Sequence, residues 1–178
     1  MTAPRQSRSL DALLDRMCAV TADDLPSEVA DHARLLIADS VICGLAGAGF
    51  SRTGMQRSIL VTAGGAPEAE VVGAGTRIPA LHAAFINADA MNLLDSDDTF
   101  LNGAHFGSLI VAAALAEAQR TGADWDDLVL AVVRGYDLTA RLHLGVTTDP
   151  RYLPTGLMAP GAALAAASVS GADRRTMA

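Results

Sequence analysis

The sequence predicts a mainly α-helical fold of a single domain, with one short β-hairpin near residues 70–78. Hydrophobic residues make up 51% of the 178 positions but aromatic residues only 4%, and a core of Ala, Leu and Val with so few aromatics is typical of packed helices. Apolar residues recur at helical spacing along most of the chain. We expect residues 1–8 to form a disordered leader and residues 9–178 to form one domain of six or seven helices, because this length suffices for a core.

Two helices are predicted in the first 50 residues. The first covers residues 9–20, with Ser9 as its cap, because apolar residues repeat there with the helical period. The second begins near Pro26, since Pro suits the first turn of a helix and the acidic Glu28 complements the helix dipole. Three glycines at positions 44, 47 and 49 then permit close helix contact or a terminus. The apolar face of the second helix consists of Val29, Ala33, Leu36, Ile37, Val41 and Leu45.

A third helix over residues 55–63 and the β-hairpin follow. The segment 64–67 stops the helix, and two short strands, 70–75 and 76–79, adjoin at a glycine turn. A glycine turn can bind phosphate, but no helix start with a suitable Lys follows this one, so we predict no nucleotide site. Pro79 then opens a helix that runs to Met91, on which His82 is interpreted as a surface or packing residue.

The second half of the chain is predicted to contain three further helices. The first, over residues 108–120, ends at Gly122. Asp124 and Asp127 form a start resembling a capping box for the next helix, which runs to about residue 144. Trp125 and Tyr136 are interpreted as packing groups of that helix. A loop over 147–155, an Ala-rich helix over 157–169 and a linker at 171–173 complete the chain.

Charge and cysteine content exclude several classes of protein. The net charge is −7 and all thirteen basic residues are arginine, so a nucleic-acid partner or an anionic membrane surface is not expected. No apolar stretch reaches the roughly 20 residues that cross a bilayer, and no signal peptide follows the N-terminal arginines, so we predict a cytoplasmic protein. Cys18 and Cys43 have neither a metal-binding nor a disulfide spacing and are interpreted as buried free thiols.

A polar stretch from Asn87 to His105 lies between two apolar, Ala-rich segments. It holds four acids and one histidine, which fit two interpretations. The stretch is either a solvated loop that ends one helix and caps the next, or the rim of an active site in which carboxylate, hydroxyl and imidazole exchange protons. The polar groups in question are Asp89, Asp95, Asp97, Asp98, Thr99 and His105.

This stretch carries a resemblance to a known family. The segment A-A-F-I-N-A-D-A-M-N-L-L-D-S-D-D-T, followed by A-H-F-G and A-A-A-L-A-E-A, resembles the MmgE/PrpD family, which includes 2-methylcitrate dehydratase and cis-aconitate decarboxylase. The resemblance begins near Asp39 and continues through V-V-R-G-Y-D-L-T-A-R-L and L-P-T-G. It implies a helical bundle of the MmgE/PrpD type, interrupted in the family by a smaller α/β domain, of which this chain covers the first, truncated part.

The resemblance also implies site residues. Asp95, Thr99 and His105 match site positions, with His105 and Asp95 in catalytic roles and Thr99 binding substrate. Asn92 and Leu153 stand where the family has histidines. The resemblance implies chemistry without a metal or cofactor, although Asp95, Asp97, Asp98 and His105 could form an oxygen-rich metal site. No lysine exists to hold a substrate carboxylate, so the candidate replacements are Arg77, Arg134, Arg141 and Arg151.

Three functions remain open from the sequence. The first is a lyase polypeptide, a dehydratase or decarboxylase acting on a small carboxylic acid, which works with a missing remainder or a partner. The second is a family member redirected to isomerisation or cyclisation of a less charged substrate. The third is a non-catalytic helical scaffold or assembly subunit. We further expect a homodimer or a complex with a second polypeptide, because a truncated helical domain leaves an apolar face uncovered.

Two expectations concern geometry. Asp95, Thr99 and His105 are expected to face one cavity, between the helix that follows Pro79 and the helix that follows His105. Asp97 and Asp98 point away from Asp95 in an extended or turn conformation. At least one of them is therefore expected to cap a helix or to bond backbone.

Overall fold

The computed structural model describes residues 5–101, 103–146 and 155–173, and the others are not described. This part of the chain contains seven α-helices, which confirms the mainly helical prediction, and its first helix begins before Ser9, inside the predicted leader. The predicted loop at 147–155 lies almost wholly outside the described residues. The helices are α1 (Arg5–Ala19), α2 (Ser27–Gly47), α3 (Ser51–Ala63), α4 (Ala80–Asn92), α5 (Gly107–Thr121), α6 (Trp125–Val146) and α7 (Ala159–Val169), with 3-10 turns η1 (Ala22–Asp24) and η2 (Thr155–Leu157).

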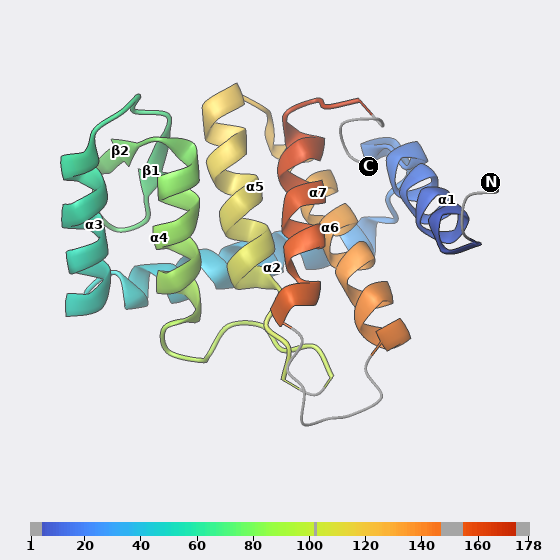
Figure 1. The fold of residues 1–178 in the computed structure, drawn as a ribbon, viewed down its shortest axis with the longest axis horizontal. Helices are drawn as coiled ribbons and strands as arrows, with labels where there is room; N and C mark the ends of the chain where they lie inside the picture. The colour runs from blue at the N-terminus through green and yellow to red at the C-terminus, as the bar shows by residue number, and fades with distance from the viewer. Residues whose placement is uncertain (1–4, 102, 147–154, 174–178) are drawn as a thin grey trace.

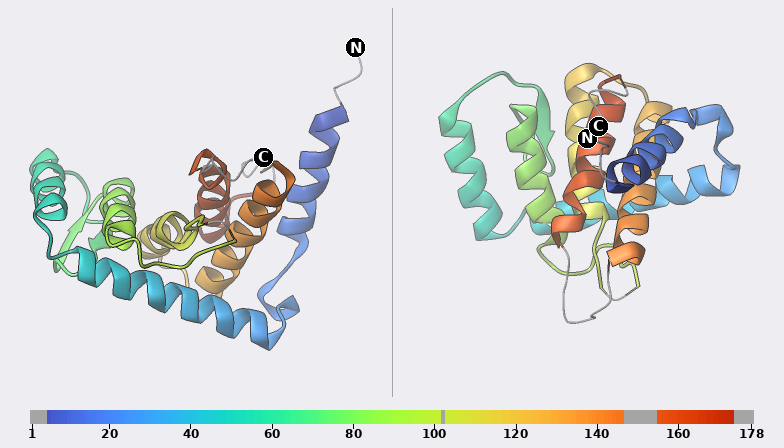
Figure 2. Two further views of the ribbon diagram at one scale, coloured as in Figure 1. Left: turned by 90° about the horizontal axis from the view of Figure 1, so that it is seen from below. Right: turned by 45° about the vertical axis from the view of Figure 1, so that its right-hand side comes forward.

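Helix α2 crosses a row formed by the other helices (Figures 1 and 2). Along this row α3 and α4 lie at one end, α5 in the middle and α7 and α6 next to it. At the other end α1 packs through Leu14 and Met17 against Leu138 of α6 and Leu164 of α7. The main core lies where α2, α4, α5, α6 and α7 meet, and Phe106 and Ile110 are among its fully buried side chains.

A glycine lets α2 and α4 cross at close range. A Cβ on Gly47 would overlap the carbonyl of Ala90 in α4, so no larger residue fits there without moving a helix. From the sequence, the glycines at positions 44, 47 and 49 were expected to permit either close helix contact or a helix terminus. Gly47 supplies both, because it is also the last residue of α2.

The predicted β-hairpin is present between α3 and α4. Strands β1 (Ala69–Val71) and β2 (Thr76–Ile78) pair antiparallel, with Glu70 opposite Arg77. Asn87 of α4, which is 1% exposed, fixes the hairpin on the helix. Its side-chain oxygen accepts from the Val72 amide at 2.9 Å and its nitrogen donates to the Glu70 carbonyl at 3.0 Å. The buried amide thus satisfies two backbone groups at the end of a strand.

The outward face of α2 is apolar. Leu35, Ile42 and Leu45 are 67, 64 and 52% exposed and follow one another at helical spacing. Leu45 was predicted to share one apolar face with Ala33 and Ile37, but in the structure the buried face of α2 continues through Ser40 and Gly44 instead. Among the described residues no single helix is both long and apolar enough to cross a bilayer; α2 and α3 meet that test of length and composition when taken together, at an angle of 92°.

Candidate active site

Residues 93–106, which join α4 to α5, form the candidate site and are called the site loop below. The amide of Asp95 donates to the Asn92 carbonyl at 3.0 Å, so the loop turns directly at the end of α4. Further along, Phe100 and Ala104 pair through two backbone hydrogen bonds and close a tight turn. Asp95 has a φ of 51°, a left-handed conformation that is uncommon outside glycine. The fold therefore holds the Asp95 side chain in a direction that a regular helix would not give it.

The imidazole of His105 lies between two carboxylates of this loop. Its Nε2 is 3.2 Å from Asp95 and its Nδ1 is 3.1 Å from Asp97. The two acids differ in burial, because the Asp97 side chain is fully buried and the Asp95 side chain is 84% exposed. The structure thus brings together the two residues that were predicted to be catalytic, and adds Asp97.

Asp97 is the partner that fixes the ring of His105. Asn92, at the end of α4, donates at 3.2 Å to Asp97 Oδ1, the same oxygen that faces the ring, and so holds the carboxylate in place. The contact between Asp97 and Nδ1 is close in distance but off the line of a straight hydrogen bond. A buried carboxylate at Nδ1 favours the tautomer with its proton there and leaves Nε2 for chemistry on the exposed side.

Asp98 caps the next helix. It accepts from the amide of Gly107, the first residue of α5, at 2.7 Å, which confirms that one of the two adjacent acids bonds backbone. Burial removes the Asp98 carboxyl from water and raises its pKa above the ordinary value of 3.8. Tyr136 of α6 has its pKa raised too, by burial and then by the Asp98 charge.

Three oxygens converge where Gly107 lacks a side chain. The hydroxyls of Ser40 and Tyr136 lie 2.5 and 2.8 Å from the position that a Cβ on Gly107 would take, and Asp98 Oδ1 lies closer still. Both hydroxyl oxygens are buried; that of Ser40 has no hydrogen-bond partner among the described residues, and that of Tyr136 meets Asp98 in a contact of poor hydrogen-bond geometry. A buried hydroxyl without a partner is rare, so this cluster is suited to bind a water molecule or a polar group of a ligand.

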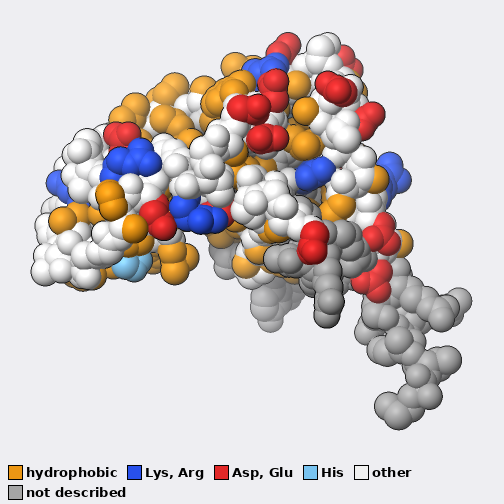
Figure 3. Space-filling model, turned by 90° about the horizontal axis from the view of Figure 1, so that it is seen from above, with side chains coloured by type: hydrophobic (Ala, Val, Ile, Leu, Met, Phe, Trp, Pro, Cys, Tyr) orange, Lys and Arg blue, Asp and Glu red, His pale blue; other side chains and the backbone are white. Residues whose placement is uncertain are grey.

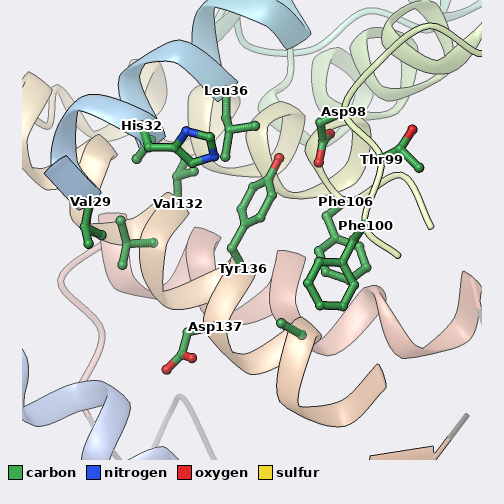
Figure 4. A pocket seen from close by; sticks show the side chains of 13 residues that line it. Val29, His32, Leu36, Asp98, Thr99, Phe100, Phe106, Val132, Tyr136 and Asp137 are labelled. Atoms are coloured by element: carbon green, nitrogen blue, oxygen red, sulfur yellow. The ribbon is translucent and has the colours of Figure 1, made fainter. Parts of the chain in front are cut away.

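A cavity of about 570 Å³ opens beside this cluster (Figure 4). Thr99 lines it, but Asp95 and His105 are not among its wall residues, so this cavity does not unite all three predicted residues as expected. Its walls are mostly apolar. They consist of Val29, His32, Ala33 and Leu36 from α2, Asp98, Thr99, Phe100 and Phe106 from the site loop, and Val132, Val133, Tyr136, Asp137 and Ala140 from α6.

The arginines proposed to bind substrate are engaged elsewhere. Arg77 donates to backbone carbonyls of the hairpin region, and Arg134 donates to the Cys18 carbonyl at 3.2 Å. Arg141 pairs with Asp137 at 2.9 Å, and Arg151 lies outside the described residues. No lysine or arginine lines the cavity. The described residues therefore place no cation where a substrate carboxylate would bind.

Other polar residues of the region have structural roles. Asp89 pairs with Arg52 and joins α4 to α3, away from His105. The thiol of Cys43 is buried, and burial raises its pKa, so it is a poor nucleophile. Cys18, which was expected to be buried, is partly exposed. Within the described ranges, no group of three or more His, Cys, Asp or Glu side chains is arranged to hold a metal ion.

Sequence reasoning missed two residues of this arrangement. Asp97 was expected to cap a helix or bond backbone, or to join a possible metal site, and Tyr136 was interpreted as a packing group. A signal for Tyr136 was available, because it follows Val132 by one helical turn on the buried stripe of α6 and carries a polar tip. No comparable signal existed for Asp97, since the direction of its side chain depends on the turn at Asp95.

Over residues 11–178 the sequence matches the family model of the MmgE/PrpD N-terminal domain. The match covers nearly the whole chain and agrees with the resemblance found in the polar stretch and the segments around it. No curated protein matches the sequence.

Proposed function

We propose that this chain, which belongs to the MmgE/PrpD family, is a lyase polypeptide that carries out dehydratase- or decarboxylase-type proton chemistry on a small carboxylic acid. One observation carries the proposal: the His105 ring lies between the carboxylates of Asp95 and Asp97. An imidazole held by a buried acid at one nitrogen and facing an exposed acid at the other has the groups that general acid–base catalysis requires.

The proposed roles follow from position. Loss of a hydroxyl or of carbon dioxide needs a group that takes a proton from carbon or gives one to it, and His105 Nε2 has this role. Asp97 holds the ring from Nδ1, while Asp95, exposed at Nε2, shares the proton during transfer. Thr99, at the cavity wall, donates a hydrogen bond to the substrate carboxylate. These steps need neither a metal nor a cofactor.

The proposed reaction also needs a cation or strong donor for the carboxylate, which the described residues do not place at the site. Either Arg151 or a residue of a second polypeptide would then supply this cation. We therefore propose that the chain works as a homodimer or in a complex. The exposed apolar side chains of α2 support this, and Figure 3 shows hydrophobic side chains gathered along one edge of the molecule.

Association is tested by sedimentation velocity at micromolar concentration. Ile42→Glu, on the outward face of α2, should lower the sedimentation coefficient of the complex to that of a monomer. Glu at Ala63, an exposed position at the end of α3, serves as the control and should leave the complex intact. A wild-type chain that is folded and strictly monomeric would contradict the proposal.

A second candidate function is favoured by the cavity itself. Its walls carry no lysine or arginine, which suits isomerisation or cyclisation of a less charged substrate better than lysis of a polycarboxylate. The two candidates use the same acid–base pair and differ in the product, which mass analysis of the turnover mixture distinguishes: a lyase product loses water or carbon dioxide, whereas an isomer keeps its mass.

The decisive experiment compares His105→Ala with His82→Ala, a histidine of α4 outside the site loop. Turnover of a panel of hydroxy-acids and unsaturated acids should fall by roughly 10²–10⁴-fold in His105→Ala and stay unchanged in His82→Ala. The melting temperature of both variants should remain close to that of the wild type. Unchanged turnover, or lost turnover explained by unfolding, would remove His105 from catalysis and favour a non-catalytic scaffold.

A further inference from the structure

The cavity beside the site loop is mostly apolar, and its two sides differ in their polar groups. Val29 and Val132 stand with His32 at one side in Figure 4, called the apolar half below, whereas Asp98 and Thr99 stand with the rings of Phe100 and Phe106 at the other, called the polar half. Tyr136 points its hydroxyl into the space between them. A volume of about 570 Å³ is within the range of small-molecule sites, which are typically mostly apolar with a few polar groups that fix orientation. The cavity therefore has the form of a site for an amphipathic ligand.

Charge limits what the apolar half can hold. Among the described wall residues, two are acids, Asp98 and Asp137, none is a lysine or arginine, and His32 alone can carry a positive charge. A carboxylate placed against Val29 and Val132 would have at most the His32 ring as a partner, and burying a charge that is not fully paired is costly. A hydrocarbon group in the same place gains free energy with every methylene that leaves water.

The polar half can hold one carboxylate. The hydroxyls of Thr99 and Tyr136 face the cavity, and that of Tyr136 is buried against Asp98 in a contact of poor hydrogen-bond geometry. Burial raises the pKa of Asp98, which favours its neutral form beside an anionic group. His105 precedes Phe106 in the chain, and the ring of Phe106 forms part of the wall, although His105 itself does not line the cavity.

We propose that the cavity between α2, α6 and the site loop binds the apolar chain of a monocarboxylic acid, with the carboxylate at Thr99 and Tyr136. This inference rests on the proposed function and names its substrate class: an acid with a hydrocarbon tail, in place of a di- or tricarboxylate. The apolar half acts as the specificity-determining element, because it accepts a methylene chain and rejects a second charge.

Calorimetric titration of the full chain with butanoate, hexanoate, octanoate and adipate tests the proposal. Affinity should rise by about fourfold for each added methylene until the cavity is filled. Adipate has the same number of carbons as hexanoate but carries a second carboxylate, and it should bind at least about tenfold more weakly. Equal binding of adipate and hexanoate, no dependence on chain length, or no binding of any monocarboxylate would each overturn the proposal.

Two matched variants locate the binding. Val29→Phe introduces a ring at the apolar half and should shorten the longest chain that still gains affinity. Val61→Phe makes the same change at a half-exposed position of α3, 44% exposed as against 38% for Val29, and should leave the series unaltered. If Val29→Phe leaves the series unaltered, the acids bind elsewhere and the proposal fails.

The same titration separates this inference from the proposed function. His105→Ala removes the acid–base group but not the apolar half, so the gain per methylene should persist while turnover is lost. Persistence of the gain in a chain without any His105-dependent turnover would contradict the lyase function alone. Turnover that depends on His105 but prefers dicarboxylates would contradict the cavity proposal alone.

Discussion

The two ends of the polar stretch, Asn87 at the hairpin and the site loop beyond Asn92, treat buried polar groups in opposite ways. Asn87 is almost fully buried, and both ends of its amide pair with backbone groups of Val72 and Glu70. Beside the site loop, the Ser40 hydroxyl of α2 is buried without a partner among the described residues, and the Tyr136 hydroxyl of α6 meets Asp98 only in a contact of poor hydrogen-bond geometry. The side-chain amide of Asn87 is therefore paired within the chain, whereas the hydroxyls beside the site loop are not fully paired.

This difference separates a structural role from a binding role. A buried polar side chain whose groups are all paired fixes the fold and offers nothing to a ligand. Unpaired buried hydroxyls cost stability, and such a cost is typical of sites where a ligand or water completes the set. Substitutions at the hairpin should therefore change the free energy of unfolding, and substitutions at the site loop should change binding and turnover.

The largest effect on stability is expected at Asn87. In Asn87→Ala the amide of Val72 and the carbonyl of Glu70 lose their partner inside the chain, and a polar group left unsatisfied in a buried environment costs about 1–3 kcal/mol. The free energy of unfolding in urea should fall by about 2–4 kcal/mol. Asn92→Ala, on the same helix but exposed, should lose less than half of that. Equal losses at the two positions would break the contrast between the ends of the stretch.

At the site loop the largest remaining effect is expected for Asp97→Asn, and it concerns turnover. The variant keeps the shape and the bond from Asn92 but removes the negative charge at His105 Nδ1. Turnover should fall by at least about tenfold, up to the loss seen for His105→Ala. Nitrogen chemical shifts of the His105 ring should show the proton less confined to Nδ1 than in the wild type.

A purely structural role for Asp97 would give a different pattern. The melting temperature would fall, turnover would fall in proportion to the unfolded fraction, and the ring shifts of the folded molecules would not change. Asp95→Asn is the matched comparison, because Asp95 faces the other ring nitrogen from an exposed position. It should lower turnover without altering the melting temperature.

The sequence predicted the fold better than the site because the two depend on different information. Helical periodicity and the Pro and Gly signals identified all the helices and the hairpin, because each is a local pattern. The matched D-x-D-D-T block identified Asp95 and His105, which the structure brings together. The position of Asp97 at Nδ1 depends on the left-handed turn at Asp95, and the cavity depends on how α2 crosses α6. Neither is encoded in a local pattern.

Asp98→Asn tests the electrostatics of the site loop through the pH dependence of stability. The pKa of Asp98 is raised in the folded state, so its neutral form is favoured there. The free energy of unfolding of the wild type relative to the variant should be highest below the ordinary pKa of 3.8 and should fall as pH rises through the raised folded pKa. Urea unfolding between pH 3 and 8 measures this difference. A relative stability of the wild type that increases with pH would reverse the sign and contradict burial as the dominant cause.

The smallest effect on stability is expected for Tyr136→Phe, and its smallness is the test. The phenol hydroxyl is buried beside Asp98 in a contact of poor hydrogen-bond geometry, so removing it costs at most one weak bond and leaves the ring packing of Phe106 against residue 136 intact. The free energy of unfolding should change by less than about 0.5 kcal/mol, or rise slightly, because an unsatisfied buried group has been removed. Hexanoate binding should nevertheless weaken, since the hydroxyl is one of the two donors assigned to the carboxylate. A loss of stability above about 1 kcal/mol would mean that the hydroxyl is paired in the folded chain, as the amide of Asn87 is, and the two ends of the polar stretch would then not differ in the way described.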